Sequence, residues 1–154
     1  MTISSTAFSP AESVKDIFSV FSLQESSKGV ELKMNVPQKH KKLVILSDAI
    51  KIRQVLTNLT SNAIKYTMEG SVEIGFNLFD DYIEFYVQDT GIGIPEQEQP
   101  KIFDTFYRCE RVIASAISGT GLGLSISKEL VGLLGGSIGF SSVPNILARI
   151  FLCL

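Results

Sequence analysis

The sequence predicts an α/β sandwich of the α+β kind, in which one mixed sheet of about five strands is covered on one face by three helices. Three observations predict this fold class. Segments with helical spacing of apolar residues are mixed along the chain with segments of strict apolar and polar alternation. A length of 154 residues fits one domain over 1–154, and 45% hydrophobic residues suffice for a real core.

Composition excludes several classes of function. A net charge of -2 with 19% charged residues lacks the basic surface that a nucleic-acid-binding domain needs. No apolar run approaches the roughly 18 residues of a membrane span, so we expect no direct membrane contact. Cys109 and Cys153 lie far apart without metal-ligand spacing. They are expected to be reduced thiols in a cytoplasmic protein.

The first predicted elements are a helix over Ser9–Lys28 and two strands after it. Ser9 is a typical N-cap, Pro10 suits the first helical position, and Glu12 completes a capping box. Alternation then predicts a strand over 30–36, and a short apolar run predicts another over 43–46.

Next come a second helix and a hairpin. Asp48 is placed to cap a helix that ends near Gly70. The buried stripe of this helix is expected to consist of Ile52, Val55, Leu56, Leu59 and Ala63. Alternation over 72–78 and over 83–87, with Asp80 and Asp81 between them, predicts a hairpin that leads to Asp89.

A long loop separates the hairpin from the closing elements. Residues 90–120 are rich in Gly, Pro, Ser and Gln, and a loop of this length is usually functional. A third helix is predicted over 122–134, stopped by the two glycines that follow. Two closing strands are predicted over 138–143 and 146–154.

One face of the second predicted helix is polar. Gln54, Asn58, Asn62 and Lys65 follow one another at helical spacing, opposite the apolar stripe. A solvated helix face is one explanation. However, asparagine is a poor helix former, and two of them one turn apart favour a ligand. Amide oxygens suit Mg²⁺ carried on phosphates, which Lys65 can meet.

Asp89 is expected to face the buried side of the sheet at the end of its strand, in phase with Ile83, Phe85 and Val87. A carboxylate there needs a donor. It can cap its own turn, or it can accept the exocyclic amine of an adenine. The second interpretation fits the glycines at 91 and 93, which allow a close approach to a flat ligand, and the apolar Ile94.

A glycine-rich segment precedes the third helix. The residues Gly119, Thr120, Gly121, Leu122, Gly123 and Leu124 open this helix, where unpaired amides and the helix dipole form a cradle for anions such as phosphate. The segment lacks the Lys-Ser/Thr ending of a P-loop and the preceding strand of a Rossmann fingerprint. Alone it is a weak signal.

Together these segments resemble the catalytic ATP-binding domain of two-component sensor histidine kinases, a branch of the Bergerat-fold ATPase superfamily. Residues 54–67 are similar to the N box of that family, 89–94 to the G1 box, 102–108 to the F box and 119–124 to the G2 box, in the family's order. The F box favours kinases over the topoisomerase, chaperone and mismatch-repair relatives. The resemblance runs from about Phe8 to the C-terminus.

The resemblance implies a binding site for ATP and Mg²⁺. Asn62 would ligate the metal, and Asp89 would read the adenine amine. The nucleotide would be held by Asn58, Asn62, Lys65, Tyr66, Asp89, Gly91, Gly93, Ile94, Phe106, Gly119, Thr120, Gly121, Leu122, Gly123 and Leu124.

The resemblance also implies a mobile lid over the phosphates at about 107–118. Catalytic roles would belong to Asn58, Lys65 and Arg108. Arg108 would contact the terminal phosphate, or it is a solvated surface charge. Hydrolytic relatives carry a glutamate one turn before the metal asparagine, where this chain has Asn58, so efficient hydrolysis by this chain alone is not expected.

Two departures from the family matter. Residues 144–149 replace the usual Gly-x-Gly and Ser/Thr of the last hairpin, which affects the expected turn. His40, the only histidine, lies in a run with Lys39, Lys41 and Lys42 and lacks the flanks of a phosphoacceptor, so we interpret it as part of a solvated basic loop. The chain therefore resembles a fragment without the phosphoacceptor and dimerisation domain.

The expected function is transfer of the γ-phosphoryl group of Mg-ATP to a histidine on that separate domain. The expected partners are ATP, that domain and, indirectly, a response regulator receiver domain, with the isolated domain a monomer. Two alternatives remain open: a degenerate nucleotide-sensing or interaction module without phosphotransfer, and an ATP-driven conformational clamp of the same superfamily.

Overall fold

The computed structural model describes residues 2–23, 29–65, 67, 70–90, 123–143 and 147–154. In chain order its elements are β1 (Thr6–Phe8), α1 (Pro10–Ser22), β2 (Val30–Asn35), the 3-10 helix η2 (Gln38–His40), β3 (Ile45–Ser47), α2 (Ala49–Lys65), β4 (Gly70–Leu78), β5 (Ile83–Asp89), α4 (Gly123–Leu133), β6 (Ser137–Val143) and β7 (Leu147–Cys153).

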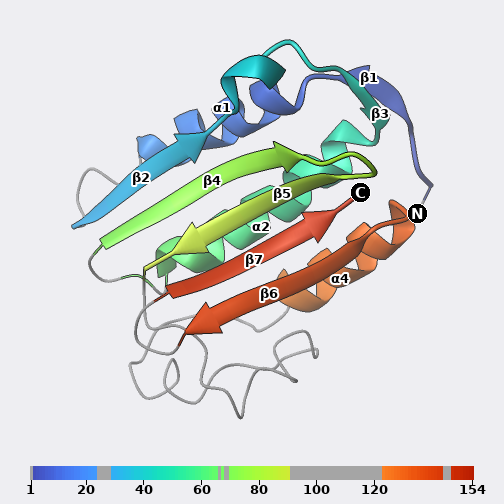
Figure 1. Ribbon diagram of the computed structural model, residues 1–154. Helices are drawn as coiled ribbons and strands as arrows, with labels where there is room; N and C mark the ends of the chain where they lie inside the picture. Colours follow the sequence, from blue (N-terminus) through green and yellow to red (C-terminus); the bar gives the residue numbers. More distant parts are fainter. Residues whose placement is uncertain (1, 24–28, 66, 68–69, 91–122, 144–146) are drawn as a thin grey trace.

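The main sheet has five strands among the described residues, in the order β2-β4-β5-β7-β6. β2 and β4 are parallel, and every other neighbouring pair is antiparallel. The helices α1, α2 and α4 lie on one face of this sheet, and none of the α-helices formed by the described residues lies on the opposite face (Figure 1). The predicted mixed sheet with helices on one face is confirmed.

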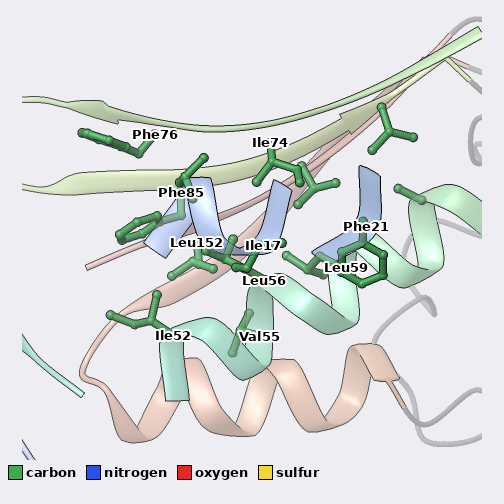
Figure 2. Close-up of a cluster of buried hydrophobic side chains, with 14 of the residues drawn as sticks. Ile17, Phe21, Ile52, Val55, Leu56, Leu59, Ile74, Phe76, Phe85 and Leu152 are labelled. Carbon is green, nitrogen blue, oxygen red and sulfur yellow. The ribbon is translucent and has the colours of Figure 1, made fainter. Parts of the chain in front are cut away.

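The core lies between the sheet and the helix layer. Side chains from α1, α2, β4, β5 and β7 meet there, and Figure 2 shows Leu56 of α2 below Phe85 of β5. Phe76 and Phe85 are fully buried, with ring centroids 6.1 Å apart. Because interiors are close-packed, these contacts fix the position of α2 against the sheet.

α1 begins as its sequence predicts. Ser9 Oγ accepts a hydrogen bond from the Glu12 N–H at 3.3 Å, and Pro10 occupies the first turn, where no donor is needed. Its apolar face buries Ala11, Val14, Ile17 and Phe21. The predicted helix extends to Lys28, but residues 24–28 lie outside the described part of the chain.

α2 also begins at its predicted cap. Asp48 Oδ1 accepts from the Lys51 N–H at 3.2 Å, and the Asp48 carbonyl accepts the first helical bond from the Ile52 N–H at 3.0 Å. The whole predicted stripe is buried: Ile52, Val55, Leu56, Leu59 and Ala63. The stripe fixes which face of α2 points away from the core.

The hairpin and the closing strands follow the prediction. In β4 and β5, Phe76 pairs with Phe85, and the rings of Phe79 and Tyr82 stack beside the turn at 4.8 Å between centroids. The third predicted helix is α4, which ends before Gly135 in a left-handed conformation (φ 79°). The two predicted closing strands are β6 and β7.

A second, two-stranded sheet was not predicted. β1 pairs antiparallel with β3, with Ala7 opposite Leu46. The apolar run predicted as a strand over 43–46 is this β3, which spans Ile45–Ser47. Three-residue strands carry too little alternation to be recognised.

The open face of the main sheet carries a polar network around Tyr86. The Tyr86 hydroxyl donates to Glu73 Oε2 at 2.7 Å and accepts from Asn35 Nδ2 at 2.8 Å. The guanidinium of Arg149 lies 4.1 Å from the centre of the Tyr86 ring and forms an ion pair with Glu84. This layer leaves Tyr86 only 2% exposed on the face of the sheet opposite α1, α2 and α4.

Within the part of the chain that the structure describes, no helix is long and apolar enough to cross a membrane.

Candidate functional site

The candidate site residues of α2 lie in its C-terminal half. Asn58 and Asn62 are half-buried, and Lys65, the last residue of the helix, is exposed. Gln54, which begins the polar ridge, is exposed. The apolar stripe fixes the rotation of the helix, and the half-buried asparagines lie beside that stripe and not on the fully opposite face that the sequence predicted. The C-terminal half of α2 therefore presents the side-chain amides of Asn58 and Asn62 and the ammonium group of Lys65.

Asp89 is the last residue of β5. It pairs with Val72 of β4 on one side and with Ala148 of β7 on the other, so its backbone is held between two strands. Along β5 it has the same parity as Ile83, Phe85 and Val87, which are buried, and its own side chain is half-buried. The predicted orientation toward the helix layer is consistent with this alternation.

The end of α2 and the end of β5 lie at the same end of the sheet (Figure 1). Connectivity requires this arrangement. α2 ends at Lys65, β4 begins at Gly70, and the first residues of β4 pair with the last residues of β5 through Val72 and Asp89. Lys65 of the predicted N box and Asp89 of the predicted G1 box, 24 residues apart in sequence, therefore lie at the same end of the sheet.

The start of α4 belongs to the same end of the molecule (Figure 1). Gly123 is the first residue of this helix and Leu124 the second. The predicted anion cradle needs amides at a helix N-terminus, and α4 supplies the helix. The other cradle residues, 119–122, lie outside the described residues.

Other predicted site residues also lie outside the described part: Tyr66, Gly91, Gly93, Ile94, Phe106 and Arg108, together with the expected lid at about 107–118. Their roles remain predictions.

A hydroxyl group closes the sheet directly after Asp89. The Thr90 N–H donates to the Ser71 carbonyl at 3.0 Å, and Thr90 Oγ1 accepts from the Ser71 N–H at 2.9 Å. Sequence reasoning did not single out Thr90. A hydroxyl-bearing residue between a strand end and a glycine was the available signal, because such side chains commonly bond to nearby backbone.

The only histidine of the sequence lies in η2, the 3-10 helix between β2 and β3. The neighbouring Lys39, Lys41 and Lys42 are exposed, as predicted, but His40 is half-buried at the end of a 3-10 helix and is not part of a solvated loop.

The chain is similar in sequence to known proteins. Residues 47–154 match the family described as histidine kinase-, DNA gyrase B-, and HSP90-like ATPase. The signal transduction histidine-protein kinase BarA of Escherichia coli K12 is 34% identical over 150 residues, which cover 94% of this chain and 16% of BarA. The sensor histidine kinase WalK of Bacillus subtilis is 41% identical over 119 residues, or 75% of this chain and 19% of WalK. The chain thus spans less than a fifth of the length of these two relatives.

Solved structures of histidine kinases have the same fold as this chain. Full-length ShkA in complex with AMPPNP superposes with a TM-score of 0.85 at 26% identity, covering 99% of this chain and 31% of ShkA. The catalytic domain of the histidine kinase ThkA superposes with a TM-score of 0.82 at 25% identity, covering 98% of this chain and 97% of the ThkA domain. The chain therefore belongs to the histidine kinase-, DNA gyrase B-, and HSP90-like ATPase family, and its Bergerat fold is that of sensor histidine kinase catalytic domains.

Proposed function

We propose that this domain binds Mg-ATP where α2, β5 and α4 meet, and that it donates the γ-phosphoryl group to a histidine on a separate dimerisation domain. One observation carries the proposal: α2, whose C-terminal half carries the half-buried Asn58 and Asn62, ends at the same end of the sheet as β5, whose last residue is Asp89 (Figure 1). The amide oxygens are then available to the metal, the ammonium group of Lys65 to the phosphates, and the carboxylate of Asp89 to the adenine.

Each described residue has a distinct task in this proposal. The Asp89 carboxylate accepts the exocyclic amine of adenine, and the side-chain oxygen of Asn62 ligates the magnesium. Asn58 and Lys65 contact the phosphates, Lys65 as a point charge. Arg108 is assigned to the terminal phosphate by the family pattern alone.

The donor set suits a metal that arrives with its nucleotide. Among the described residues there is no cluster of three or more His, Cys, Asp or Glu side chains that could hold a metal. Magnesium keeps several waters and takes the rest of its ligands from phosphates and one or two protein oxygens, which an asparagine next to a phosphate site can supply. When bound, the metal would neutralise charge on the phosphates.

The same residues disfavour the clamp alternative. A hydrolytic enzyme of this superfamily needs a base one turn before the metal residue, and Asn58 has no proton-accepting carboxylate. The domain then acts mainly by positioning and charge neutralisation, and an external histidine serves as nucleophile.

Calorimetric titration of the chain with ATP, with and without magnesium, tests the site. We expect magnesium-dependent binding that Asp89→Asn abolishes and Asn62→Ala weakens at least about tenfold. Asn77→Ala is the matched control, because Asn77 is a half-buried asparagine near the far end of β4 and donates to Glu84 Oε1 at 3.4 Å. Absence of binding in the folded wild type would favour the degenerate interaction module.

The phosphotransfer step needs a second experiment. Incubated with γ-labelled ATP, the chain alone should gain no stable label, and a phosphoacceptor domain from a sensor kinase should become labelled when added. Stable label on the chain alone would contradict the division of labour, and rapid release of phosphate would revive the clamp.

A further inference from the structure

The exit of the chain from β5 has an unusual hydrogen-bond pattern. In an antiparallel ladder every second pair of opposed residues exchanges two backbone bonds, each N–H donating to the carbonyl of the other residue. Here the Thr90 N–H donates to the Ser71 carbonyl, but the Ser71 N–H donates to the Thr90 hydroxyl at 2.9 Å. The side chain of Thr90 thus occupies the acceptor position that a backbone carbonyl holds in a regular pair.

This hydroxyl bond stabilises the residue before it. Asp89 pairs with Val72, one position from the Ser71–Thr90 pair. Strand ends without such a bond open easily, and the side chain of the last residue then has no fixed direction. With both bonds made, the backbone of Asp89 is held on both sides along the chain.

Gly70 shows that the space for the hydroxyl is built into the fold. A Cβ atom at Gly70 would lie 2.1 Å from Thr90 Oγ1, and Gly70 has a φ of +123°, which favours glycine. The Gly70 N–H also donates to the Gly29 carbonyl at 3.4 Å. The beginning of β4 is thus adapted to hold the Thr90 side chain.

We infer that Thr90 is a positioning residue for nucleotide selectivity. Its hydroxyl fixes the end of β5 so that the Asp89 carboxylate meets the exocyclic amine of adenine, which sets the preference for ATP over ITP. This inference rests on the proposed nucleotide site. ITP carries a carbonyl oxygen where ATP carries the amine, so a correctly placed carboxylate accepts from one base and repels the other.

The test compares the affinities of both nucleotides for the whole chain with magnesium present. Thr90→Val replaces the hydroxyl by a methyl group and keeps the branched shape of the side chain. Thr90→Ala removes both the hydroxyl and the methyl group. Both should lower ATP affinity about fivefold or more, the equivalent of one net hydrogen bond, while ITP affinity stays within about twofold. Thr90→Ser keeps the hydroxyl and should restore the wild-type ratio.

A purely structural role predicts a different pattern. Loss of sheet stability alone would lower both affinities equally and leave the ratio of ATP to ITP unchanged in Thr90→Val and Thr90→Ala, which would overturn the inference. Faster amide exchange at Ser71 in these variants reports whether the bond was lost.

The same titrations distinguish failure of the proposed nucleotide site from failure of the inference about Thr90. If the wild type binds neither nucleotide, the proposed function fails and the inference with it. If the wild type binds ATP and ITP equally well, nucleotide binding stands, but both the proposed role of Asp89 toward the amine and the inference about Thr90 are wrong.

Discussion

The ammonium group of Lys51 lies 2.9 Å from the carboxylate of Asp48, and both side chains are largely buried at the start of α2. Asp48 Oδ2 also accepts from the Ser4 N–H at 2.9 Å, and Lys51 Nζ donates to the Thr2 carbonyl at 2.6 Å. The Asp48 carboxylate therefore caps α2, the helix that carries Asn58. Together with Lys51 it also binds the backbone of the N-terminal segment to the start of that helix.

This arrangement predicts an acid-sensitive contribution to stability. The hydrogen bond from Lys51, followed by that from the Ser4 backbone, lowers the pKa of Asp48 from 3.8 to about 2. Because the folded state has the lower pKa, the contribution is fully present above about pH 4 and is lost as the pH falls toward 2. Urea unfolding should show Asp48→Asn less stable than wild type at pH 7, with the gap closing between pH 4 and 2.

Lys51→Met is the matched variant for this prediction. It removes the largest cause of the lowered pKa, so the folded and unfolded pKa values of Asp48 come closer together and the loss of stability between pH 4 and 2 should be smaller than in wild type. A constant difference between wild type and Asp48→Asn over the whole acid range would show that the carboxylate charge plays no part.

The sequence predicted most of the fold because its signals were local. The caps Ser9 and Asp48, the buried stripe of α2 and the alternation of β4 and β5 each depend on residues within a few positions of one another. The family motifs likewise predicted that the ends of α2 and β5 belong to one site.

The remaining features depend on distant contacts. Nothing near Asp48 indicates that it also binds the Ser4 N–H, 44 residues away. The pairing of β1 with β3 rests on two three-residue strands. The bond between Thr90 and Ser71 appears only once β4 and β5 are in register. Such pairings follow from tertiary packing and leave no periodic pattern.

Tyr86 predicts an alkaline transition. Burial, and then the hydrogen bond to Glu73, raise the pKa of Tyr86 from 10.0 to about 12. The neutral phenol is thus favoured in the folded state, so its contribution is fully present below pH 10 and is lost as the pH rises toward 12. A denaturation series from pH 8 to 12 should show this loss in wild type and its absence in Tyr86→Phe.

At neutral pH Tyr86→Phe should be less stable than wild type by about 1 kcal/mol, because Asn35 and Glu73 lose their hydrogen bonds to the buried Tyr86 hydroxyl. Tyr82→Phe is the control at neutral pH, since Tyr82 is 40% exposed and stacks on Phe79 through its ring. Equal stability of Tyr86→Phe and Tyr82→Phe would contradict a role for the Tyr86 hydroxyl.

Two glycines should respond in opposite directions to alanine. A Cβ atom at Gly75 would lie 2.7 Å from the Asn35 carbonyl and 2.8 Å from the Tyr86 hydroxyl, both held in place by the sheet, so Gly75→Ala should lower the melting temperature. At Gly132, in the last turn of α4, a Cβ atom would meet nothing within 4 Å among the described residues. Gly132→Ala should stabilise the domain by up to about 1 kcal/mol through helix propensity. Thermal melts of both variants beside wild type test these two predictions. A shift of the melting temperature in the same direction for both variants would contradict the difference in available space at the two glycines.

Thr60 offers a stabilising change within α2. Its side chain is fully buried, and Thr60 Oγ1 has no hydrogen-bond partner in the part of the chain that the structure describes. A buried hydroxyl without a partner costs free energy, whereas a methyl group at the same position does not. Valine has the same branched shape and nearly the same helix propensity, so Thr60→Val should raise the free energy of unfolding by about 1 kcal/mol.

Thr57→Val makes the same chemical change on the exposed side of the helix. Its hydroxyl is solvated, so we expect a change within about 0.5 kcal/mol of zero, measured like Thr60→Val by urea unfolding at pH 7. If Thr60→Val is instead destabilising, the Thr60 hydroxyl has a partner, and that partner lies outside the described residues or is a bound water. Because Thr60 lies between Asn58 and Asn62 on α2, the same variant should also be titrated with Mg-ATP. Unchanged affinity would show that the buried face of α2 contributes stability while its polar face contributes the site.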